Sequence, residues 1–136
     1  METSVATRSN LQIIQEGFAD FAEGNIRGII DLCADDVAWG GYKIPGVDLS
    51  GYFYGKEGVE DFFNRLSSEI DMTEFEPKEF IAQGDVVVVL GHEAGKVKVT
   101  GKTYEQDWCG VFRLKNGKVQ SCFQFSDTYE FAKAFS

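Results

Sequence analysis

A hairpin near the C-terminus, centred on Asn116-Gly117, constrains the fold more than any other feature of this 136-residue sequence. Asn-Gly between two alternating segments is the strongest short-range signal for a two-residue β-hairpin turn. Such a turn pairs Lys115 with Lys118, and because side chains alternate along a strand, it also decides which residues share a face. One face then carries a mainly apolar row: Trp108, Phe112, Leu114, Val119, Phe123 and Phe125. The opposite face carries Cys109, Val111, Cys122 and Gln124. We expect the apolar row to be buried in the core.

The chain before this hairpin is predicted to form helices first and strands afterwards. Apolar residues at helical spacing predict helices at about residues 9–23, 26–33 and 56–70. A short strand is expected at Val37–Trp39 and an ordered aromatic loop at Gly51–Gly55. Further strands are expected at 79–83, 86–100 and 102–115, with Gly91 and Gly95 as candidate bulges. This order predicts an α+β fold in a single domain, residues 1–136, of which residues 1–8 form a flexible tail.

The charge balance narrows the classes of partner. There are 22 acidic and 13 basic residues, which gives a net charge of −9. A surface of this sign repels nucleic acid and anionic membranes, so we expect neither as a partner. The 12 phenylalanines indicate a core, or the wall of a cavity, that is rich in aromatic rings.

Cysteine and histidine usage predicts no cofactor or metal. The three cysteines have no CxxC spacing and there is one histidine, so a Cys/His metal site is not expected. Reduced thiols are typical of cytoplasmic proteins. The N-terminal residues lack the apolar region of a signal peptide, and no segment reaches the ~20 apolar residues of a membrane span. We therefore expect a cytoplasmic location.

Two segments are distinctive beyond their periodicity. Gly55-Lys56-Glu57-Gly58-Val59 opens the third predicted helix, and a closing segment runs from Phe112-Arg113 through Gly117-Lys118-Val119 to Asp127-Thr128. Together with DLCADDVAW at residues 31–39, they resemble the SnoaL-like polyketide cyclases, which belong to the wider group of ketosteroid isomerase and nuclear transport factor 2. The resemblance covers about residues 8–133.

The resemblance implies a fold and a catalytic residue. The fold is a cone-shaped, curved and mainly antiparallel sheet wrapped around three N-terminal helices, with a deep pocket inside, and it is commonly dimeric. SnoaL-like cyclases use an aspartate near the end of the last strand as general acid/base, and Asp127 is the matching position. In an apolar pocket, desolvation raises the pKa of such a carboxyl group toward the range useful for proton transfer.

Asp127 also has a purely structural interpretation. The sequence Asp-Thr-Tyr-Glu at 127–130 matches a capping box, in which Asp127 caps a short terminal helix. Both interpretations stay open. The hairpin register places Gln106 opposite Asp127, where we expect it to donate a hydrogen bond to the substrate. His92 is the next candidate base, and the sequence does not decide which face of the sheet it occupies.

The leading hypothesis is an enzyme with an aromatic pocket that binds a small hydrophobic or carbonyl-containing molecule. It would catalyse a cofactor-free proton shift, such as isomerisation or aldol-type cyclisation. The candidate ligand-binding residues are Trp39, Tyr54, Trp108, Phe123 and Phe125, whose simplest role is core packing. The alternatives are a non-catalytic ligand-binding module and a dimeric interaction scaffold. The mixed face carrying Cys109, Val111, Cys122 and Gln124 is expected to form a homodimer contact.

Overall fold

The computed structural model describes residues 8–136, so residues 1–7 of the predicted tail lie outside the described residues. Within that range the elements follow one another as α1 (Asn10–Ala22), α2 (Ile26–Leu32), β1 (Cys33–Gly41), β2 (Tyr52–Tyr54), α3 (Gly55–Glu69), β3 (Ile70–Gln83), β4 (Val86–Val97), β5 (Thr103–Lys115), β6 (Lys118–Phe125) and α4 (Thr128–Phe135).

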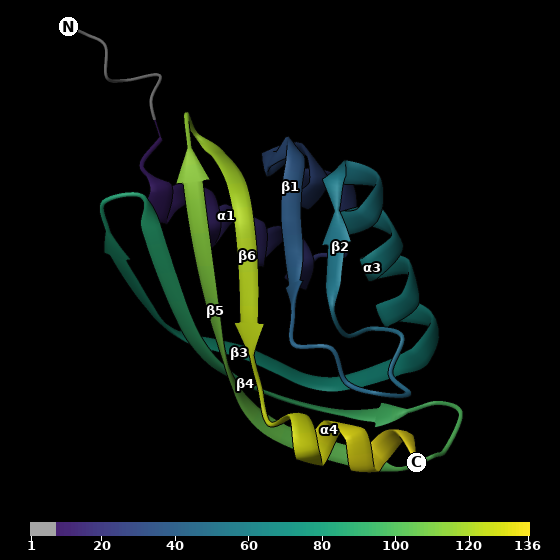
Figure 1. Ribbon diagram of the computed structural model, residues 1–136. Coiled ribbons are helices and arrows are strands. Elements are labelled where there is room, and N and C mark those ends of the chain that lie inside the picture. The colour runs from purple at the N-terminus through teal and green to yellow at the C-terminus, as the bar shows by residue number, and fades with distance from the viewer. Residues whose placement is uncertain (1–7) are drawn as a thin grey trace, which may run out of the picture.

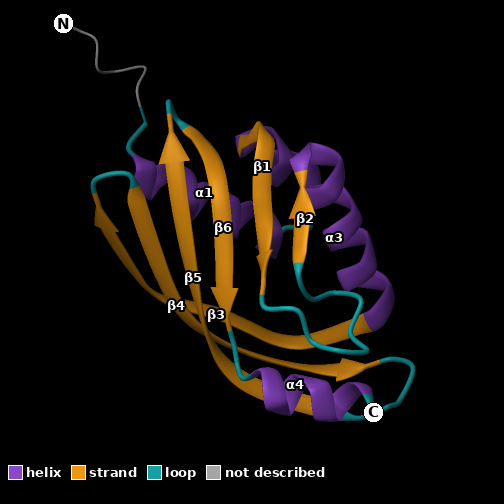
Figure 2. Cartoon of the chain, in the orientation of Figure 1, coloured by secondary structure: helices purple, strands orange, loops and turns teal. Residues whose placement is uncertain are grey.

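The strands form one curved, unclosed sheet in the order β2-β1-β6-β5-β4-β3. Neighbouring strands are antiparallel except β1 and β6, which run parallel. Helix α1 crosses behind the sheet and α3 lies beside β2, whereas α4 lies across the far end of β4 and β5 (Figures 1 and 2). We call the face that packs on α1 and α3 the concave face, and the other the convex face. The predicted α+β class, with a curved sheet wrapped on helices, is confirmed.

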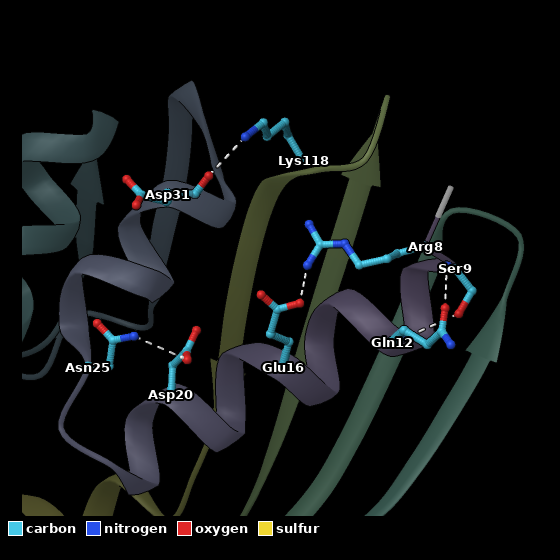
Figure 3. A network of polar contacts seen from close by, with 8 residues as sticks. All are labelled: Arg8, Ser9, Gln12, Glu16, Asp20, Asn25, Asp31 and Lys118. Atoms are coloured by element: carbon cyan, nitrogen blue, oxygen red, sulfur yellow. Dashed lines mark hydrogen bonds and ion pairs between the residues drawn. The ribbon is translucent and has the colours of Figure 1, made fainter. Parts of the chain in front are cut away.

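Helix α1 begins at a capping box formed by Ser9 and Gln12. The Ser9 hydroxyl accepts a hydrogen bond from the N–H of Gln12 at 3.1 Å, and the Gln12 side chain accepts one from the N–H of Ser9 at 2.9 Å (Figure 3). These bonds satisfy two N–H groups at the helix start. Ile13 and Ile14 then face inward, so that α1 is held against the sheet by an apolar stripe.

The main core lies between the concave face and the helices. Its buried members come from α1, α2, α3 and the central strands, and include Ile13, Ile14, Ile30, Val37, Trp39, Val59, Phe63, Val87, Val89, Trp108 and Phe112. A second buried cluster lies toward α4 and includes Val47, Ile70, Val97, Tyr104 and Ala134. Both clusters border the cavity described below.

Gly91 and Gly95 of β4 make room for aromatic rings and are not bulges. The register between β4 and β5 is unbroken. A Cβ atom at Gly91 would lie 2.2 Å from Cζ2 of Trp108, and one at Gly95 would lie 2.9 Å from the hydroxyl oxygen of Tyr104. The irregularities lie instead in the neighbouring strand β3. Bulges therefore occur in the β3–β4 ladder beside Gly95 and Gly91, but their extra residues lie in β3, and close approach of aromatic side chains explains the two glycines.

The predicted register fails at a bulge early in β6. The first two pairs after the turn are as expected, but the pairing then shifts and leaves Gln120 as the extra residue. Because a slip of one residue exchanges the faces of a strand, Cys122 is fully buried in the core, while Phe123 and Phe125 lie on the convex face. The β5 half of the predicted row is buried as expected, with Trp108 and Phe112 in the core. The β6 half beyond Val119 was assigned to the wrong face.

The first part of the sheet is longer than predicted. The strand expected at Val37–Trp39 extends over Cys33–Gly41, and the expected loop at Gly51–Gly55 contains β2, which pairs with β1. The parallel pairing of β1 with β6 extends β1 in both directions. Neither segment alternates over enough residues to indicate a strand in the sequence alone.

Candidate functional site

A cavity of about 170 Å³ lies between the concave face, α1 and α3. Its wall is mostly apolar and includes Ile14, Phe18, Trp39, Phe63, Phe75 and Trp108. The polar side chains of the wall are fewer and include Ser50, Glu93, Gln106, Gln124, Ser126 and Thr128. Glu93 is the one carboxyl group among the described lining residues.

The carboxyl group of Glu93 is fixed by its neighbours in the sheet. Strand β4 places Glu93 on the concave face, opposite Gln106 of β5. Its Oε2 accepts a hydrogen bond from the Tyr104 hydroxyl at 3.0 Å. Burial raises the pKa of the Glu93 carboxyl group above its ordinary value, and hydrogen bonds from Tyr104 and Gln106 offset part of the rise because they favour the ionised form. A raised pKa brings this group toward the neutral range, where a general acid/base is effective.

Gln106 links Glu93 to the start of the last helix. Its side chain is buried, and its Oε1 accepts a hydrogen bond from the backbone N–H of Asp127 at 3.0 Å. The amide NH₂ group of Gln106 is then free to donate a hydrogen bond to the Glu93 carboxyl group. Gln106 therefore lines the cavity as a residue held at both ends, and its role as a donor to substrate stays a prediction.

Asp127 lies outside the cavity lining and caps α4. Its Oδ1 accepts a hydrogen bond from the backbone N–H of Glu130 at 3.1 Å, and the residue is exposed. The expectation that its carboxylate points into the cavity, free of the helix N–H groups, is wrong. The chain leaves β6 at Phe125, so the alternation that pointed Asp127 inward has already ended. The geometry matches its structural interpretation, and its catalytic role stays a prediction.

Trp39 and Trp108 line the cavity, as expected for ligand-binding residues. The Trp108 ring stacks on Phe75, with ring centroids 5.1 Å apart and an interplanar angle of 12°, and on Phe18 at 5.7 Å and 7°. The indole Nε1 of Trp108 is buried without a hydrogen-bond partner among the described residues. A buried donor without a partner is costly, and a ligand acceptor in the cavity is one way to satisfy it.

Tyr54, Phe123 and Phe125, the other predicted ligand-binding residues, are absent from the cavity wall. They form a continuous set of aromatic contacts with Tyr52 and with Tyr42, which also borders the cavity, and we call this set the convex aromatic patch. The bulge at Gln120 accounts for the displacement of Phe123 and Phe125. The expected role of these three residues in the pocket is therefore not supported by their position.

His92 lies on the convex face, away from the cavity. Its Nδ1 is 2.8 Å from Oδ1 of Asp107, and its Nε2 is 2.8 Å from Oε2 of Glu105. Hydrogen bonds to Asp107 and then Glu105 raise the pKa of His92. A base in this position does not reach a ligand in the cavity, so the structure gives no support to His92 as the base of that site.

Glu93 was missed in the sequence, although a signal for it was present. The alternation that places Val97 on the buried face places Glu93 on the same face, four residues earlier. An acid in phase with a buried row of valines is unusual, because charged residues are rarely buried without partners. Its partner Tyr104 lies opposite Gly95. The turn between β4 and β5 does not by itself determine that register, so the contact between Glu93 and Tyr104 was not predicted.

An α+β fold whose curved sheet and helices enclose an aromatic cavity is typical of the NTF2-like proteins. The model of the SnoaL-like domain matches residues 14–122, so the chain belongs to the SnoaL-like domain family. This confirms the resemblance found in the sequence. None of the helices in residues 8–136 is long and apolar enough to cross a membrane.

Solved structures agree with this assignment. An NTF2-like protein of Burkholderia xenovorans is 31% identical over 93% of this chain and 95% of its own, with a TM-score of 0.83. An NTF2-like protein of Burkholderia thailandensis is 26% identical over 96% and 99%, with a TM-score of 0.86. TerC, co-crystallised with polyporic acid, is 27% identical over 93% and 97%, with a TM-score of 0.82. A comparison with curated proteins gives no match.

Proposed function

We propose that this protein binds a small aromatic or carbonyl-containing molecule in its cavity and catalyses a cofactor-free proton transfer, with Glu93 as general acid/base. The observation that carries the proposal is a partly buried carboxyl group of raised pKa on the wall of an otherwise apolar cavity. Titratable groups with perturbed pKa values in a cavity are the usual candidates for catalysis. The reaction class is abstraction of a proton next to a carbonyl group, as in isomerisation or aldol-type cyclisation.

The cavity bounds the size of the ligand. A cavity near 150 Å³ accommodates a single benzene ring, so about 170 Å³ favours one ring with small substituents. Trp39, Trp108 and Phe75 provide flat apolar surfaces for such a ring. The unpartnered Nε1 of Trp108 is suited to a ligand oxygen. The complex of TerC with polyporic acid supports an aromatic ligand for this chain too.

Binding can be measured through the protein's own fluorescence. The chain has two tryptophans, and both line the cavity, so a ligand that enters it should change their emission. A series of one-ring aryl ketones provides suitable probes. We expect saturable quenching, which a polar substitution in the wall, Phe75→Asn, should weaken more than Phe125→Asn on the convex face. Equal effects of the two substitutions would contradict binding in the cavity.

Proton transfer can be tested with the same aryl ketones in deuterated water. We expect the protein to accelerate hydrogen–deuterium exchange next to the carbonyl group, and Glu93→Gln to slow that exchange by about 10²–10⁴-fold. Asp127→Asn is the matched control, because Asn caps a helix about as well as Asp and cannot act as a base. Loss of exchange in Asp127→Asn with retention in Glu93→Gln would overturn the assignment. Binding without exchange would favour the non-catalytic binding module.

A further inference from the structure

We propose that Glu74, His92 and Glu105 form a zinc-binding site on the convex face of the sheet, with Asp107 as a positioning residue. The potential ligand atoms of the first three residues all lie within 4.8 Å of one another. The cluster is separate from the cavity, so the proposal is independent of the function proposed above. One histidine with two carboxylates is a different donor set from the Cys/His combination that the sequence argues against.

Three adjacent strands hold the cluster. His92 of β4 is directly opposite Asp107 of β5, and Glu105 is two residues away on the same face of β5. Glu74 of β3 is two residues from Glu76, which pairs with His92. The register between β4 and β5 is unbroken, so it holds His92, Glu105 and Asp107 on one face, about 4.8 Å from strand to strand. Glu74 follows a register shift in β3, and its carboxylate still lies within reach of the other two ligands.

The donor atoms suit zinc in number and type. Imidazole nitrogen and carboxylate oxygen both bind Zn²⁺ at about 2.0–2.2 Å, and tetrahedral ligands at those distances are separated by about 3.3–3.6 Å. The present separation of Nε2 of His92 from Oε2 of Glu105 is 2.8 Å, so a small side-chain rotation is enough to admit the ion. The two carboxylates balance the charge of the ion, and water can occupy the fourth position.

Asp107 prepares His92 for this role from the other side of the ring. Its Oδ1 lies 2.8 Å from Nδ1, where it accepts the Nδ1 proton and leaves Nε2 directed at the cluster. Carboxylate–histidine–zinc arrangements use this contact to orient the ring and to increase its basicity. Without metal, a proton on Nε2 is shared with Glu105, so the ion and this proton compete for one position.

His92 is the sole histidine of the chain, which makes the test direct. Tag-free protein is titrated with zinc chloride at neutral pH while the imidazole nitrogens are followed by nitrogen-15 NMR. We expect a shift of Nε2 that saturates at one equivalent, release of a proton, and a rise in melting temperature with zinc concentration. His92→Gln should abolish saturable binding. Magnesium, which prefers oxygen ligands, should not shift the imidazole.

Variants separate ligands from general electrostatics. Glu74→Gln and Glu105→Gln should each weaken zinc binding at least tenfold, and Asp107→Asn by about 10–100-fold. Glu79→Gln removes one exposed charge from the same strand β3 outside the cluster, and should leave the affinity unchanged. Cys109→Ser tests the partly exposed thiol of β5 and should also be neutral. Unshifted imidazole nitrogens at millimolar zinc, or equal zinc binding by His92→Gln, would overturn the proposal.

Discussion

At the scale of residues, burial of the Glu93 carboxyl group favours acid/base chemistry but lowers the stability of the fold. Burial disfavours its charged form, while the Tyr104 hydroxyl and Gln106 amide favour it, and burial is the larger effect. The folded state therefore holds the Glu93 proton to a higher pH than the unfolded chain does. The same property makes the group useful as an acid/base and lowers the stability of the fold near neutral pH.

The sign of this effect can be tested. Between the unfolded pKa of Glu, about 4.3, and the raised folded pKa, the native state binds more protons, so the free energy of unfolding falls as pH rises through that window. Each unit of difference is worth about 1.4 kcal/mol. Glu93→Gln removes this loss, so its stability relative to the parent protein should increase with pH across the window. Urea denaturation at a series of pH values measures it, with Glu79→Gln as an exposed control, and parallel profiles would contradict it.

At the scale of elements, the sequence correctly predicts which face a side chain occupies wherever the strand alternates without a bulge. Strand β5 alternates without interruption, and Trp108 and Phe112 were assigned to the correct face. Strand β6 carries a bulge at Gln120 that the sequence does not predict, because unbroken alternation would group Phe123 and Phe125 with Val119 and so favours the wrong phase. The prediction of the site succeeded and failed for the same reason. Gln106 lies on the regular strand β5 and lines the cavity as expected, whereas Asp127 follows the bulged strand β6 and caps α4 instead.

Gly91 of β4 leaves the space that the Trp108 ring of β5 occupies. A Cβ atom there would meet Cζ2 of Trp108 at 2.2 Å and the backbone oxygen of Glu76 at 2.7 Å, so Gly91→Ala must displace the indole or the strand. We expect a loss of about 1–3 kcal/mol in stability and a shifted tryptophan emission. Gly17→Ala in α1 is the control, since its Cβ would meet only Leu32 at 3.4 Å and alanine favours helix. A neutral Gly91→Ala variant would contradict the packing described here.

At the scale of the whole molecule, the convex aromatic patch exposes several large aromatic side chains. Tyr42, Tyr54 and Phe125 are 60%, 69% and 43% exposed. The expected homodimer contact keeps its place on the convex face but changes its residues, because Cys122 is in the core and Gln124 lines the cavity. Contiguous apolar patches of this kind usually mark association sites.

We expect a homodimer that uses this patch. Sedimentation should give about twice the 15.2 kDa of the single chain at micromolar concentration, and Phe125→Asp should shift the protein to monomer by placing a charge in the contact. Glu23→Lys at the exposed end of α1 changes charge away from the patch and should leave the dimer intact. A monomeric parent protein would refute this assembly.

The assignment of Glu93 as the titrating group of the cavity is tested most directly by carbon-13 NMR of its carboxyl carbon, identified by its absence in Glu93→Gln. We expect the Glu93 signal to titrate above the ordinary range for glutamate and to move when a one-ring aryl ketone binds, while the Asp127 signal does not respond to ligand. A Glu93 pKa at or below the ordinary value, with the ligand response at Asp127 instead, would contradict the account.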